Sequence, residues 1–175
     1  ISEEHPLNPT SPYAASKVAA DRYCYSYIKT YNLPITIIRP FNTYGPRHTY
    51  DVVPKFIKMA LTNKLITIHG GGLQSRDLTY VSDAVDAFLK VGLSGKTNQK
   101  VVNFGTGKHQ TVIFLAKQIK KLCRSKSKIV YIPARKAEVQ RLTCDAKLCK
   151  RLTGWSPKIG IIDGLKKNIE WAKKN

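Results

Sequence analysis

Hydrophobic positions recur along this chain at two spacings, one typical of amphipathic helices and one typical of strands. Between Val112 and Cys123 apolar residues return every three or four positions, which predicts a helix with one buried face. Ile35–Ile38 is instead an unbroken β-branched run, which predicts a strand covered on both faces in a parallel sheet. Similar patterns predict helices over 12–32, 52–61, 83–93, 112–123, 146–153 and 161–174, and strands over 35–38, 65–68, 77–81, 101–104 and 129–132.

Helical and strand stretches alternate, which predicts the α/β class. The segment Arg39–His48 is predicted to be a loop at the carboxyl end of a strand, where ligands gather in open α/β sheets. Gly70–Gly72 either closes a hairpin between two strands or binds a phosphate. Gly105–Gly107 lacks the third glycine and the downstream acid of a dinucleotide-binding fingerprint, so we interpret it as a turn.

The first predicted helix carries the clearest candidate chemistry. Ser11 is a good N-cap, and Tyr13 and Lys17 then stand four apart on one helix face. An ammonium one turn from a tyrosine hydroxyl stabilises the phenolate, which suits the phenol to acid/base work. The same spacing recurs at Tyr25 and Lys29, where packing and a solvated lysine are the simpler interpretation. Its position in the first turn favours Tyr13.

Composition narrows the class of protein. A chain of 175 residues with 42% hydrophobic residues suits one globular domain. We find no apolar run long enough to span a bilayer and no signal-peptide pattern. The four cysteines form no C-x-x-C pair and the four histidines are scattered, so no metal site is predicted, and isolated thiols favour the cytoplasm. Because the chain opens on Ile1 rather than Met, we expect a missing front end.

The formal net charge of +19 is unevenly distributed. Residues 101–175 hold 18 Lys and Arg against 4 Asp and Glu, whereas residues 1–100 hold 12 against 7. Such a surface attracts polyanions, and a non-catalytic module for nucleic acid or an acidic partner is the alternative to an enzyme. Because 22 of the 30 cations are lysines, a solvated lysine-rich face is the simpler interpretation.

Five motifs occur together in one order along the chain. They are SPYAASK, RPFNTYGPR, SRDLTYVSDAVDAF, NFGTG and the closing LTGWSP with GLKKNIEW. Their order and spacing resemble NAD-dependent nucleotide-sugar epimerases and dehydratases, which are extended short-chain dehydrogenases/reductases. The resemblance covers nearly the whole chain, but only the second half of the family pattern. The glycine-rich loop of the family and the Ser/Thr of its catalytic triad belong upstream of Ile1.

The resemblance implies the C-terminal portion of a Rossmann-type doubly wound parallel sheet plus a smaller α/β substrate-binding lobe. Residues 1–50 and about 80–107 are expected mainly on the Rossmann side, and 51–79 and 108–175 mainly in the lobe. The implied reaction begins with hydride transfer from sugar C4 to NAD, and epimerase, 4,6-dehydratase and decarboxylase outcomes all stay open. We expect a homodimer of the full-length protein acting on a UDP- or dTDP-sugar, without nucleic acid or membrane, and an inactive isolated chain.

The resemblance also implies the role of each site residue. Tyr13 is expected to take a proton from the sugar 4-hydroxyl, and Lys17 to hold the nicotinamide ribose and assist Tyr13. Pro40 and Phe41 are expected beside the nicotinamide. The implied substrate-binding set is Asn42 near the diphosphate, Val53 near the nucleotide, Arg76 and Arg135 on the diphosphate, and Glu138 on the nucleotide's ribose.

Overall fold

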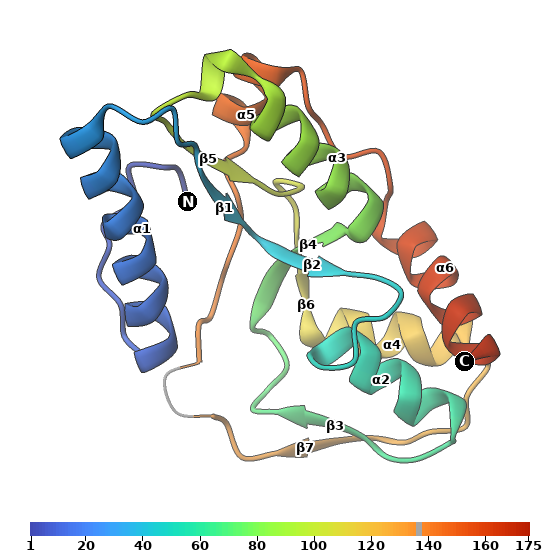
Figure 1. The fold of residues 1–175 in the computed structure, drawn as a ribbon. Helices are drawn as coiled ribbons and strands as arrows, with labels where there is room; N and C mark the ends of the chain where they lie inside the picture. Colours follow the sequence, from blue (N-terminus) through green and yellow to red (C-terminus); the bar gives the residue numbers. More distant parts are fainter. Residues whose placement is uncertain (136–137) are drawn as a thin grey trace.

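The computed structural model describes residues 1–135 and 138–175 and alternates helices with strands (Figure 1). The helices are α1 (Pro12–Tyr31), α2 (Val52–Leu61), α3 (Val81–Leu93), α4 (Val112–Leu122), α5 (Lys147–Thr153) and α6 (Ile161–Lys174), with a short 3-10 helix, η1 (Gly95–Thr97). The strands are β1 (Ile37–Pro40), β2 (Asn42–Tyr44), β3 (Ile66–His69), β4 (Ser75–Tyr80), β5 (Val101–Phe104), β6 (His109–Thr111) and β7 (Ile129–Ile132). The predicted α/β class is confirmed.

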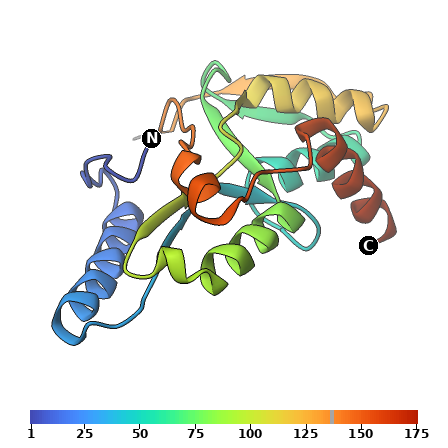
Figure 2. The ribbon, with the colours of Figure 1, turned by 90° about the horizontal axis from the view of Figure 1, so that it is seen from above.

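One part of the molecule is built on β1 and β5, which pair in parallel with Arg39 opposite Asn103. Figures 1 and 2 show α1 and α3 on opposite sides of this strand pair. Burial of apolar surface between α3, β5 and α5 stabilises the arrangement. The buried residues of this cluster are Ala84, Ala87, Val91, Val102, Phe104, Cys149 and Trp155.

The other part combines α2, α4 and α6 with the remaining strands. β2 pairs with β4 in parallel, β4 pairs with β6 in antiparallel fashion, and β3 pairs with β7 in parallel. Tyr44 of β2 packs edge-on against Tyr80, with ring centroids 5.6 Å apart, and its hydroxyl donates to the Ile161 carbonyl at 3.3 Å. The largest core side chains include Phe56, Ile57, Ile66, Ile68, Leu115, Ile119 and Leu165.

Three predicted details are wrong. Gly70–Gly72 does not close a hairpin, because the two edges of β4 are taken by β2 and β6 while β3 pairs with β7. The predicted loop over 39–48 contains the end of β1 and all of β2, which pairs with β4. The predicted strand over 35–38 is displaced to 37–40, since the Ile35 N–H bonds within a tight turn to the Leu33 carbonyl.

Asp83 of α3 binds the segment between α5 and α6. Its Oδ2 accepts the backbone N–H groups of Lys158 and Ile159 at 2.9 and 2.8 Å. Its carbonyl accepts the Trp155 indole N–H at 3.1 Å. Ser82 and Asp83 are residue types that favour an N-cap, but α3 begins earlier, at Val81, and has no side-chain cap.

Candidate active site

The start of α1 carries the predicted acid/base pair. Ser11 caps the helix as predicted, since its Oγ accepts the N–H three residues on at 3.2 Å. Lys17 Nζ lies 5.5 Å from the centroid of the Tyr13 ring, and Tyr13 is 73% exposed. Lys29 lies at the same 5.5 Å from the Tyr25 ring, so this distance does not separate the two pairs. What distinguishes Tyr13 is its place in the first helical turn.

Pro40 and Phe41 lie where β1 ends. The Phe41 N–H donates to the Phe104 carbonyl at 3.0 Å, which extends the ladder between β1 and β5 by one residue. Pro40 is exposed and Phe41 is half-buried. Both residues therefore stand at the carboxyl end of a parallel strand pair, the edge at which open α/β sheets bind ligands.

A cavity of about 670 Å³ lies among β2, α2, β3 and β4. It is lined by all five predicted substrate-binding residues, namely Asn42 of β2, Val53 of α2, Arg76 of β4, and Arg135 and Glu138 from the segment after β7. The four residues predicted for catalysis and cofactor binding are not among its described lining residues. The fold thus gathers the predicted substrate-binding residues in the cavity. It places the predicted catalytic and cofactor-binding residues on α1 and at the end of β1.

Arg76 fastens the segment after β7 to the wall of this cavity. Its Nη2 forms an ion pair with Glu138 Oε1 at 3.0 Å. Its Nη1 donates to the Val139 carbonyl at 2.6 Å and to the Ser75 carbonyl at 2.9 Å. Both charged side chains are about four-fifths buried, so the pair holds a defined geometry at the cavity wall.

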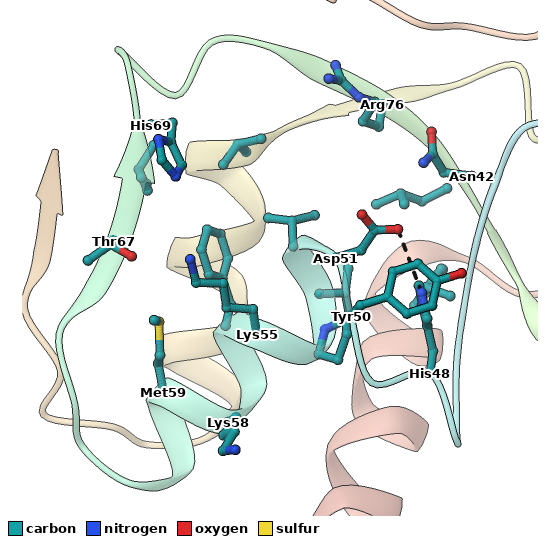
Figure 3. A pocket seen from close by; sticks show the side chains of 18 of the residues that line it. Asn42, His48, Tyr50, Asp51, Lys55, Lys58, Met59, Thr67, His69 and Arg76 are labelled. Carbon is teal, nitrogen blue, oxygen red and sulfur yellow. Dashed lines mark ion pairs between the residues drawn. The ribbon is translucent and has the colours of Figure 1, made fainter. Parts of the chain in front are cut away.

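Several lining residues were missed by sequence reasoning. Lys55 and Met59 stand one turn apart on α2, and Thr67 and His69 lie on the same face of β3, on the side of the cavity away from Asn42 (Figure 3). A signal was present for both pairs. The α2 positions flank the buried helix face, and the β3 positions alternate with buried isoleucines.

The loop between β2 and α2 forms another side of the cavity. His48 Nε2 lies 3.7 Å from Asp51 Oδ2, and the His48 ring packs edge-on against Tyr50 with centroids 4.4 Å apart (Figure 3). Arg47 and Asp51 adopt φ values of 68° and 76°, which residues with a side chain rarely do. Such backbone strain is concentrated at functional sites.

The lining of the cavity is cationic overall. Its charged members are Lys55, Lys58, Lys64, Arg76, Arg135, Asp51 and Glu138, so cations outnumber carboxylates among the described residues. Apolar groups such as Val53, Phe56 and Ile68 complete the wall. A cationic wall with paired arginine donors suits phosphate oxygens, and an apolar wall suits a flat ring.

Within residues 1–135 and 138–175 no cluster of His, Cys, Asp and Glu is arranged to hold a metal ion. In the same part of the chain no helix is both long and apolar enough to cross a membrane.

Comparison with known proteins places the chain in a family. The family described as GDP-mannose 4,6 dehydratase matches residues 1–168. The chain therefore belongs to this family, within the NAD-dependent nucleotide-sugar epimerases and dehydratases.

Individual relatives agree on the fold. The mouse dTDP-D-glucose 4,6-dehydratase is 37% identical over 184 residues, which cover 100% of this chain and 51% of that protein. A dTDP-glucose 4,6-dehydratase from Bacillus anthracis, solved in complex with NAD, superposes with a TM-score of 0.93 at 33% identity, covering 100% of this chain and 56% of that one. A UDP-glucose 4-epimerase from Thermotoga maritima, solved with UDP-glucose, gives 0.94 at 33% identity, covering 99% and 57%. The chain thus spans about half the length of these relatives, and their Rossmann-type fold confirms the predicted fold class.

Proposed function

We propose that this chain is the C-terminal part of an NAD-dependent nucleotide-sugar epimerase or 4,6-dehydratase that acts through transient oxidation at sugar C4. One observation carries the proposal. A single cationic cavity gathers Asn42, Val53, Arg76, Arg135 and Glu138, the residues that the family resemblance assigns to the nucleotide sugar. The relatives solved with NAD and with UDP-glucose support the same chemistry.

The residues at the start of α1 and the end of β1 fit a nicotinamide cofactor. Tyr13 and Lys17 offer an exposed hydroxyl and an exposed ammonium, and Lys17 enters no ion pair within the described residues. Phe41 offers a half-buried ring directly after the carboxyl end of β1. When bound, NAD supplies the acceptor for the hydride that leaves sugar C4.

We assign transfer of the sugar 4-hydroxyl proton and stabilisation of the phenolate charge to residues of α1. In our proposal the Tyr13 phenolate takes the proton of the sugar 4-hydroxyl, so that C4 becomes a ketone as the hydride leaves. The Lys17 ammonium stabilises that phenolate. Returning the hydride to the other face of the C4 ketone gives an epimer. A dehydratase product forms when water is first eliminated across C5 and C6 and the hydride then returns to C6.

The cavity binds the part of the substrate that is remote from the reacting carbon. Arg135 and Arg76 pair with the diphosphate oxygens, and the Asn42 amide bonds near the diphosphate. Glu138, fixed by its ion pair with Arg76, accepts a hydrogen bond from the nucleotide's ribose, and Val53 packs near the nucleotide. Binding energy collected here positions the sugar for proton transfer elsewhere.

Two features of this chain, its two-stranded β1–β5 pair and an apolar surface on α3, support our proposal that activity requires a further polypeptide segment. Among the described strands β1 pairs with β5 alone, whereas parallel strands are normally parts of larger sheets. On one side of this pair α3 presents apolar side chains that are between 47% and 84% exposed, namely Val85, Phe88, Leu89 and Leu93. We propose that a cofactor-binding half covers these groups, that the isolated chain does not turn over, and that the complete protein is a homodimer.

Turnover is the test of this proposal. The chain is assayed with NAD and either UDP-glucose or dTDP-glucose, alone and joined to the NAD-binding half of the Thermotoga maritima epimerase. We expect turnover in the joined protein only. Tyr13→Phe should lower its kcat about 10²- to 10⁴-fold, the range typical of losing a general acid/base, with KM unchanged. Tyr25→Phe is the matched control, because it changes the other tyrosine–lysine pair of α1 and should leave kcat unchanged.

The proposal fails if the joined protein turns over neither sugar nucleotide. It also fails if Tyr13→Phe keeps full activity, since the proton would then pass through another group. An equal loss in Tyr13→Phe and Tyr25→Phe would show that α1 tolerates no change of tyrosine, and would remove the evidence for Tyr13.

A further inference from the structure

Arg39 of β1 contacts chain segments on both sides of the predicted acid/base. Its Nε donates to Asp21 Oδ2 at 2.7 Å, and its Nη2 lies 2.7 Å from the same oxygen. Its Nη1 donates to the Glu3 carbonyl at 3.0 Å. One guanidinium therefore links the two ends of the segment from Glu3 to Asp21, which contains Tyr13 and Lys17.

The helix α1 has few other attachments. Asp21 and Ile28 are its two buried residues, and Figures 1 and 2 show α1 standing apart from the other helices. Ile28 lies near the C-terminal end of α1, so Asp21 is the buried anchor of the half that begins with Tyr13. Tyr13, Lys17 and Asp21 follow one another at four-residue intervals, so a displacement of Asp21 moves all three side chains together.

Glu3 extends this contact to the second strand. Its Oε1 accepts the backbone N–H of Asn103 at 2.8 Å. Asn103 stands directly opposite Arg39 in the register of β1 and β5. The segment that leads into α1 is therefore bonded to both strands just before the carboxyl end that carries Phe41.

Charge makes this contact sensitive to the loss of one partner. Burial raises the pKa of Asp21, but hydrogen bonds from Arg39 and Arg22 outweigh burial and hold that pKa below its usual range. The Asp21 carboxylate is therefore ionised at neutral pH. Removing Asp21 leaves the Arg39 guanidinium without its ion-pair partner, and removing Arg39 leaves the buried Asp21 carboxylate with the half-exposed Arg22 as its remaining ion-pair partner among the described residues.

We propose that Arg39 is a positioning residue that acts through Asp21 and Glu3 to hold Tyr13 and Lys17 in place relative to the end of β1. The proposal rests on the function proposed above for Tyr13, and assigns Arg39 no contact with a ligand. A lysine cannot replace Arg39, because one ammonium lacks the planar fork that reaches two acceptor groups at once.

Hydrogen exchange of the chain's own amides tests the proposal without requiring turnover. We expect Arg39→Lys and Asp21→Asn to accelerate exchange over residues 13–20 about tenfold or more, because each change breaks the buried anchor. Asp86→Asn, which removes a half-buried ion pair of 3.0 Å with Lys90 on α3, is the matched control and should leave α1 unchanged. The affinity for UDP should be the same in all three variants, because the described residues that line the cavity include none of α1.

In the joined protein Arg39→Lys and Asp21→Asn should each lower kcat about tenfold with KM unchanged. Asp21→Glu should keep most of the activity that Asp21→Asn loses, because it restores the ion pair. Unchanged exchange in α1 overturns the proposal, as does acceleration spread over the whole chain, which would indicate general unfolding. Failure of the proposed function gives a different result, because Tyr13→Phe would then keep full turnover whatever the exchange of α1 shows.

Discussion

At the scale of single residues, the Asp77 carboxylate joins β4 to two loops through hydrogen bonds. Its side chain is fully buried next to Arg76 in β4. Its Oδ1 accepts the backbone N–H and the hydroxyl of Thr106 at 2.8 and 2.5 Å. Its Oδ2 accepts the backbone N–H groups of Gly107 and Cys144 at 2.9 and 3.0 Å. One carboxylate thus satisfies donors from two loops that pack against the strand of Arg76.

Asp77→Ala should lower the free energy of unfolding by about 3–5 kcal/mol, because it leaves three backbone donors without their acceptor, and the Cys144 N–H among them is buried. Urea denaturation followed by circular dichroism measures the change. Asp163→Ala is the control, since Asp163 is exposed and lies 3.4 Å from Lys166, and its loss should cost below about 0.5 kcal/mol. Equal effects of the two substitutions would contradict this account of Asp77.

At the scale of elements, local signals predicted the helices well and the strand partners poorly. Ser11 caps α1 through its side chain as predicted, Thr111 caps α4 in the same way, and Gly154 ends α5 with a φ of 70°. These features depend on residues within one helical turn. The pairing of β3 with β7 joins segments some sixty residues apart, and nothing near Gly70–Gly72 encodes that choice.

The docking of α6 onto β2 depends on a glycine in the helix. A Cβ at Gly164 would collide with the ring and hydroxyl of Tyr44, whereas a Cβ at Gly92 of α3 would meet nothing within 4 Å. Alanine is favoured over glycine in a helix by about 1 kcal/mol. Gly92→Ala should therefore raise the free energy of unfolding by up to about 1 kcal/mol, while Gly164→Ala should lower it. Thermal unfolding of both variants measures this, and stabilisation by Gly164→Ala would contradict the packing of Tyr44.

At the scale of the whole molecule, the cavity could be predicted only in part. Its five predicted residues run from Asn42 to Glu138 and came from the family resemblance, because no spacing along the chain brings them together. The pairing of β2 with β4 and of β3 with β7 assembles them. Lys55 and His69 each lie next to a buried face of their own element, which is a local signal, but their place in the same cavity wall depends on which strands become neighbours.

The positive charge of the molecule is compatible with a nucleic-acid-binding surface or with a diphosphate site, and binding experiments can distinguish the two. The described cavity lining is cationic, but exposed lysines and arginines also cover other elements, including Lys117 and Lys121 of α4 and Arg151 of α5. A surface of that kind binds nucleic acid with an affinity that falls steeply as salt is added. A diphosphate site formed by particular arginines depends instead on those side chains.

Calorimetric titration of the chain with UDP-glucose and dTDP-glucose tests the central claim most directly, because it measures the cavity without requiring turnover. We predict one binding site per chain, weakened about tenfold or more by Arg76→Ala and by Arg135→Ala, each of which removes charge-assisted hydrogen bonds to the diphosphate. Arg151→Ala, a change of the same type at an exposed position of α5 outside the described cavity lining, should leave the affinity unchanged. Binding that all three substitutions leave intact, or that short RNA abolishes at low salt but not at high salt, would contradict the assignment of this cavity to a nucleotide sugar.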